Sequence, residues 1–108
     1  MGSSTTSDAE ALRLRLQRTL EHLVDSDDHR GVVRLVEHWS ELGELSIEVL
    51  RAEAKSLIAL CLMDRAWVRL REAAAIAPED PLTQLLTAEM FVQRGWPARA
   101  RRVLERVE

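Results

Sequence analysis

The chain has 108 residues, enough for one domain, and its 46% hydrophobic and 31% charged residues are proportions of a globular protein rather than a disordered one. Its net charge of −3 offers no general basic field for nucleic acid or an anionic membrane, and its single cysteine excludes a disulfide within the chain. No apolar run approaches the roughly 20 residues of a membrane span and no secretory signal opens the chain, so we expect a cytoplasmic protein.

The first predicted helix begins at a capping-box pattern, Ser7 to Glu10, in which each side chain can satisfy a free backbone N–H group. Leucines then recur every three to four residues from Leu12 to Leu23, which places them on one helical face. The acidic segment at 25–28 favours a turn and ends this helix.

The second predicted helix covers about residues 29–42, with Trp39 on its apolar face, and Gly43 is expected to close it in a left-handed conformation. Ser46 then caps a third helix. Its apolar stripe continues to Cys61, which we therefore expect to be a packed small hydrophobe rather than a reactive thiol.

The fourth predicted helix covers about residues 66–77. Asp80, followed by a proline, is a strong start for a fifth, because the aspartate caps the helix and the proline has no N–H to leave unpaired. Gly95 closes the fifth helix and Pro97 begins a sixth. Six short helices with short connections predict an all-α fold of antiparallel neighbours.

A step of 34 residues aligns the third and fourth helices with the fifth and sixth. Two antiparallel helices approach closely only where a residue at their crossing is small, and Ala54 opposite Ala66 and Ala73 meets this need. In this register small residues match small ones and bulky residues match bulky ones: Ala54 with Ala88, Leu57 with Phe91, Cys61 with Gly95, Ala66 with Ala100, and Leu70 with Leu104.

This spacing resembles that of the tetratricopeptide repeat family, and the sequence Ala-Pro-Glu-Asp-Pro at 77–81 is similar to the joins between such repeats. The early Trp and Leu of the family signature are missing, because Leu50 and Glu53, and then Gln84 and Thr87, stand in their places.

Residues 12–45 match the pattern only loosely, so we interpret them as a degenerate first repeat or an amino-terminal cap. The resemblance implies an α-α superhelix of three antiparallel helix pairs in one domain, residues 8–108. The expected parts are a flexible tail at 1–7 and helix pairs at about 8–43, 46–78 and 80–108.

In such a superhelix the first helix of each pair lines a concave groove, which would hold a partner protein or peptide. Arg51 and Lys55 would donate to an anionic group there; the alternative is that both belong to a solvated helix face. The carboxylate clamp of heat-shock co-chaperones is not expected, because it relies on Asn and the chain has none. The other implied groove residues are Glu48, Ile58, Leu82, Leu85, Glu89 and Val92, joined from the degenerate first unit by Leu14, Gln17, Glu21 and Val24.

The chain stops after the second helix of the last repeat, without the polar capping helix that a solenoid normally needs. Either the chain is a piece of a longer protein, or a partner or a second copy covers apolar side chains there, and we favour the latter. The candidate interface residues are Trp67, which lies off the main stripe of its helix, and Leu86, Met90, Val103 and Val107.

Catalytic and metal sites are not expected. The chain has no Gly-rich phosphate loop and no Ser–His–acid arrangement, its histidines lack zinc spacing, and the acidic segment at 25–28 lacks the spacing of a calcium loop. We therefore expect neither an enzyme nor a bound cofactor. The arginines at 94–106 lack the aromatic platforms of a nucleic-acid surface, which leaves contact with an acidic protein surface as an alternative to a solvated helix end.

Three functional hypotheses follow from these features. The first is a scaffold or adaptor module that recruits a protein or peptide through the groove and the uncapped end. The second is a small chaperone, similar to those of secretion systems, that shields an aggregation-prone subunit. The third, weaker hypothesis is a regulatory fragment attached to an enzyme or a filament protein.

Overall fold

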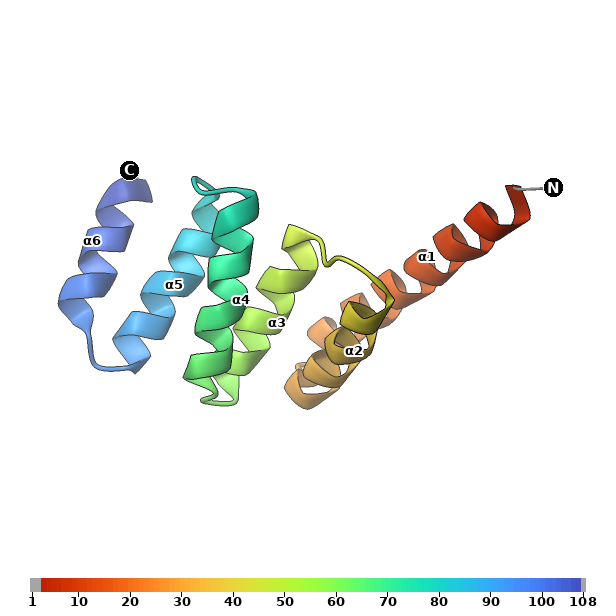
Figure 1. Cartoon of the computed structure of the whole chain (residues 1–108). Helices are drawn as coiled ribbons and strands as arrows, with labels where there is room; N and C mark the ends of the chain where they lie inside the picture. Colours follow the sequence, from red (N-terminus) through yellow and green to blue (C-terminus); the bar gives the residue numbers. More distant parts are fainter. Residues whose placement is uncertain (1–2, 108) are drawn as a thin grey trace.

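The computed structural model describes residues 3–107, which form six α-helices joined by short connections (Figure 1). The all-α prediction is confirmed. The helices are α1 (Ser3–Asp25), α2 (His29–Leu42), α3 (Ile47–Ala59), α4 (Met63–Ile76), α5 (Pro81–Gln93) and α6 (Pro97–Val107).

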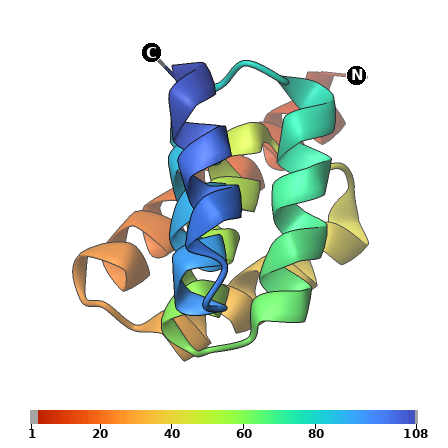
Figure 2. The same cartoon turned by 90° about the vertical axis from the view of Figure 1, so that its left-hand side faces the viewer.

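The helices pack as three successive antiparallel pairs in chain order, and the first helix of the last pair, α5, also contacts the first helix of the middle pair, α3. The row is elongated, with extents of 56 × 26 × 21 Å. Viewed from the α6 end, α6 lies in front of α5, and α4 stands beside them (Figure 2). This arrangement is the predicted stack of helix pairs. No helix within residues 3–107 is both long and apolar enough to cross a bilayer.

The predicted helix starts at Ser46 and Asp80 are confirmed. Their side-chain oxygens accept the backbone N–H three residues further on, at 3.4 and 2.9 Å. Asp28 caps α2 in the same way, at 3.0 Å. The acidic segment before α2 therefore has a structural role, because its last aspartate satisfies an amide that would otherwise be unpaired.

The start of α1 was predicted wrongly. The capping-box pattern at Ser7 lies inside the helix, which begins at Ser3. Serine and threonine are only mildly unfavourable within a helix, so the backbone hydrogen bonds continue through this segment instead of ending at Ser7. The resulting α1 has 23 residues and extends beyond the 14-residue α2 (Figure 1).

The turn inside each pair has the same conformation. Its central residue has a positive φ: 54° at Asp27, 61° at Cys61 and 80° at Gly95. At Cys61, the amides of this residue and the next donate to the carbonyls of Ile58 and Leu57, at 3.0 and 2.8 Å, and both other turns repeat these two bonds. This is the Schellman pattern, which satisfies carbonyls at the end of the first helix.

The helix boundaries repeat with the same period as the turns. The second helices α2, α4 and α6 begin at residues 29, 63 and 97, and the first helices end at 25, 59 and 93. The 34-residue period therefore extends through the first pair, although its side chains match the other pairs only loosely. Leu20 and Val32 are buried at the positions that alanines occupy in the later pairs.

Two expectations about turn residues were wrong. Cys61 is exposed, because α3 ends at Ala59 and the positive φ turns this side chain away from the apolar stripe. Gly43, with φ 155° and ψ −167°, lies outside the left-handed helical region and begins an extended connection to α3 instead of closing α2 with a tight turn.

The core confirms the small residues expected where helices cross. Ala54 of α3 and Ala66 of α4 are fully buried in one cluster, which continues into the last pair through Ala88 and Ala100. A second cluster joins α1, α2 and α3 around Val36. Close helix packing at these alanines positions α3 and α5 beside each other.

One carboxylate lies inside the middle pair. The side chain of Glu53 on α3 is 1% exposed and accepts a hydrogen bond from Nε of Arg69 on α4, while Arg69 also contacts Glu72 at 3.1 Å. The second oxygen of Glu53, Oε2, has no hydrogen-bond partner among the described residues. Burial raises the pKa of Glu53, and the hydrogen bond and charge of Arg69 lower it by less.

Candidate functional site

The predicted groove lies between α3 and α5, where the first helices of successive pairs leave a hollow of about 420 Å³. The structure therefore brings together side chains that are far apart in the sequence. Six of the eight groove residues predicted on α3 and α5 are among them, whereas the four predicted on α1, Leu14, Gln17, Glu21 and Val24, do not line this hollow. The lining consists of Glu48, Arg51, Ala52 and Lys55 from α3, and Leu82, Leu85, Leu86 and Glu89 from α5.

The α5 side of the groove is apolar and open. Leu82 is 55% exposed and Leu85 is 46% exposed, and because they stand three residues apart on one helix, they share a face. Leu86 is partly buried and packs against the core. Two neighbouring exposed leucines beside a hollow provide apolar area that a bound segment can remove from water.

Arg51 is engaged within the protein and is not the free donor that the sequence suggested. Its Nη1 lies 2.8 Å from Oδ2 of Asp80, the residue that caps α5, and the two side chains are only 18% and 16% exposed. The pKa of Asp80 is lower than its ordinary value. The largest cause is the hydrogen bond from the Thr83 side chain, and the next is the hydrogen bond from Arg51. This pair fixes the start of α5 against α3.

The charged rim of the groove is therefore mixed. Lys55 is exposed and makes no ion pair among the described residues, whereas Glu48 and Glu89 are exposed carboxylates on either wall. With Arg51 neutralised by Asp80, one cation and two anions remain at the rim. A bound segment would place apolar residues on the leucines and charges of both signs at its edges.

Two of the groove residues predicted on α3 and α5 lie elsewhere. Ile58 is 1% exposed and belongs to the core cluster beside Leu57, so it cannot reach a partner. The repeat pattern placed it correctly on α3, but close packing near the end of that helix buries it. Val92 is 58% exposed and does not line the groove.

The candidate interface residues of the last pair also divide into buried and exposed ones. Met90 is 2% exposed and packs in the core, which corrects its assignment to a surface. Helix α5 is apolar around most of its circumference, so periodicity alone could not identify its buried face. Val103 and Val107 are partly buried, and Leu104, which was not singled out as an interface residue, is 40% exposed on α6.

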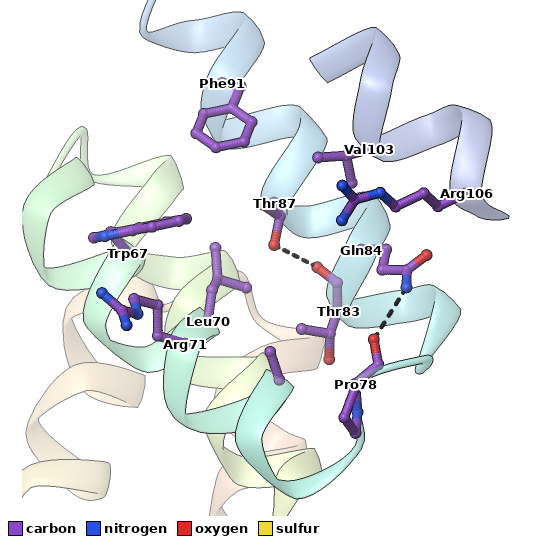
Figure 3. Close-up of a pocket in the computed structure, with 11 residues that line it drawn as sticks. Trp67, Leu70, Arg71, Pro78, Thr83, Gln84, Thr87, Phe91, Val103 and Arg106 are labelled. Atoms are coloured by element: carbon purple, nitrogen blue, oxygen red, sulfur yellow. Dashed lines mark hydrogen bonds between the residues drawn. The ribbon is translucent and has the colours of Figure 1, made fainter. Parts of the chain in front are cut away.

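Trp67 is 39% exposed, as its position off the apolar stripe suggested, and it lines a second hollow of about 320 Å³ between α4, α5 and α6 (Figure 3). Its ring centroid lies 5.7 Å from that of Phe91, and the guanidinium carbon of Arg71 lies 5.8 Å from the Trp67 ring centroid. The sequence showed no motif for this hollow, because its walls come from three helices.

No group of three or more potential metal ligands gathers within residues 3–107. Comparisons with protein-family models, with curated proteins and with solved structures find no match to this chain. The tetratricopeptide resemblance therefore stays a prediction that rests on the period, the turns and the small residues at the helix crossings.

Proposed function

We propose that this protein is an interaction module, a scaffold or adaptor, that binds a partner protein or peptide in the groove between α3 and α5. The observation that carries the proposal is the pair of open leucines, Leu82 and Leu85, beside a hollow between two stacked helix pairs. Concave surfaces made by successive helix pairs are where such folds hold extended or helical segments.

The rim supports a partner of mixed charge. Lys55 can pair with a carboxylate of the bound segment, and Glu48 and Glu89 can pair with its basic residues. Because such exposed pairs contribute little affinity, we expect the leucines to supply most of the binding free energy and the charges to select the partner and its orientation.

The test compares partner capture by two variants with equal charge changes. The tagged protein, Leu85→Glu and Val68→Glu are used to capture partners from the source organism, and recovered proteins are quantified by mass spectrometry. Val68 is the matched control, because it is 54% exposed on α4 and does not line the groove. Arg51→Glu is less suitable, since it would break the contact with Asp80.

We expect mass spectrometry to identify a partner protein that the parent chain and Val68→Glu both enrich. The recovery of this protein should fall about tenfold or more with Leu85→Glu. Thermal unfolding of both variants checks that they remain folded. A partner that Leu85→Glu retains, or that both folded variants lose equally, would exclude the groove as the binding site. If the captured partner is a second copy of the chain, sedimentation shows a dimer that Leu85→Glu dissociates.

A further inference from the structure

The hollow around Trp67 is separate from the groove, because its walls come from α4, α5 and α6 and it shares no lining residue with the groove. Figure 3 shows Trp67 on one side and Arg106 on the other, with the guanidinium of Arg106 directed into the hollow. Thr83, Thr87 and Gln84 of α5 lie between them.

The floor of this hollow is closed by internal contacts. The hydroxyl of Thr87 donates to the carbonyl of Thr83 at 2.8 Å, and the amide of Gln84 donates to the carbonyl of Pro78 at 3.1 Å. These donors are occupied, so the floor presents mainly methyl and methylene groups together with the faces of Trp67 and Phe91. The volume is at the lower end of pockets that hold small ligands and suits one bulky apolar side chain.

The charges around the hollow have one sign. Arg71 and Arg106 line it, and none of its lining residues is a carboxylate. Four other arginines, at 51, 65, 69 and 94, are held in ion pairs, whereas Arg71 and Arg106 make none among the described residues. Glu79 lines an adjoining hollow that shares Arg106, so an anion bound at Arg106 would compete with this carboxylate.

We propose that the hollow between α4 and α6 is a second docking site, which takes a bulky apolar side chain of an acidic protein segment. The side chain would rest against Trp67 and Phe91, and flanking carboxylates would pair with Arg71 and Arg106. A single-stranded nucleic acid fits less well, because it needs a continuous basic track with successive stacking rings, and the guanidinium carbons of Arg94 and Arg99 already lie 5.2 and 4.7 Å from the centroid of the next ring, Trp96.

The experiment measures binding of a fluorescein-labelled acidic peptide, in which one leucine is flanked on each side by glutamates, by fluorescence anisotropy. The variants are Arg71→Gln and Arg106→Gln. The matched control is Arg101→Gln on α6, because Arg101 is exposed, does not line the hollow and makes no ion pair among the described residues. A second peptide carries serine in place of the leucine.

We expect the parent chain and Arg101→Gln to bind the leucine peptide equally, and each lining variant to bind it about fivefold or more weakly. The serine peptide should also bind more weakly, because it lacks the apolar side chain that would rest against Trp67 and Phe91. These results are independent of whether a partner occupies the groove.

The proposal is overturned if the parent chain does not bind the acidic peptide, or if the control weakens binding as much as the lining variants, which would show a diffuse charge effect. Tighter binding of a single-stranded oligonucleotide of equal charge would assign the site to nucleic acid instead. Circular dichroism of each variant confirms that the helices are intact, so that lost binding is not lost folding.

Discussion

Three residues with positive φ hold the turns inside the helix pairs, and they differ in how well they tolerate this conformation. Gly95 adopts it without steric cost, and aspartate, as at Asp27, tolerates it better than most residues. Cys61 has a Cβ atom that crowds the backbone in the left-handed region, at a cost of roughly 1–2 kcal/mol. The middle turn is therefore strained at one residue.

Cys61→Gly is expected to stabilise the protein. Removing the Cβ atom relieves the left-handed strain, and this gain exceeds the roughly 0.4–1 kcal/mol that glycine costs through greater freedom of the unfolded chain. We expect a net gain of about 0.5–1 kcal/mol in the free energy of unfolding, measured by urea denaturation. Cys61→Ala is the control, because it keeps the Cβ atom and should change little. A loss of stability in Cys61→Gly would show that the left-handed conformation of Cys61 is not strained.

Single residues also show which features can be predicted from the sequence and which cannot. Ser46 and Asp80 were predicted as caps, because capping depends on residue type and immediate neighbours. Cys61 was placed on an apolar stripe, because periodicity does not show that a helix has already ended. Arg51 was expected to be a free donor, because its contact with Asp80, 29 residues away, depends on how the pairs stack.

At the level of elements, α3 and α4 are joined by an ion pair between Glu53 and Arg69, of which the Glu53 side chain is 1% exposed. Such a pair requires both partners, because removing one leaves a buried charge without compensation. The sequence placed Glu53 where the repeat pattern has a bulky apolar residue, and the structure explains this exception through its contact with Arg69.

The raised pKa of Glu53 predicts a pH dependence of stability. The folded state binds the Glu53 proton more tightly than the unfolded state, whose pKa is near the model-compound value of 4.5. The contribution of Glu53 to the free energy of unfolding is therefore favourable at low pH, and it is lost as pH rises through the folded-state pKa of Glu53. Glu53→Gln, which does not titrate, is the reference.

We expect the free energy of unfolding of the parent chain, relative to Glu53→Gln, to increase as pH is lowered from about 7 to about 5. Urea denaturation of both proteins at the two pH values measures this difference, and other carboxylates largely cancel because both proteins contain them. A difference that decreases or stays constant over this range would show that burial does not raise the pKa of Glu53.

Helix α5 shows the limit of periodicity for whole elements. Its bounds were predicted, because a capping aspartate with a following proline and a terminal glycine mark both ends. Its buried face was not, because apolar residues surround the helix and only packing against α3, α4 and α6 separates buried Met90 from exposed Leu85. The sequence singled out Trp67 but not the hollow around it, because the walls of that hollow come from three helices.

At the scale of the whole molecule, stacking of helix pairs creates two surfaces on one small domain. The groove between α3 and α5 carries exposed leucines with a mixed rim, and the hollow between α4 and α6 carries an aromatic wall with two arginines. Their lining residues do not overlap, so both sites could be occupied at once. This separation is what a scaffold that joins two partners requires.

Site-specific photo-crosslinking can show directly whether the groove between α3 and α5 receives the partner. A photoreactive phenylalanine analogue replaces Leu85 in the groove, or Val68 on α4 as the control, in the full chain within the source organism. We predict a covalent adduct of one partner protein from position 85 and none of that protein from position 68. Equal adducts from both positions, or adducts from position 68 alone, would show that the partner does not bind in the groove.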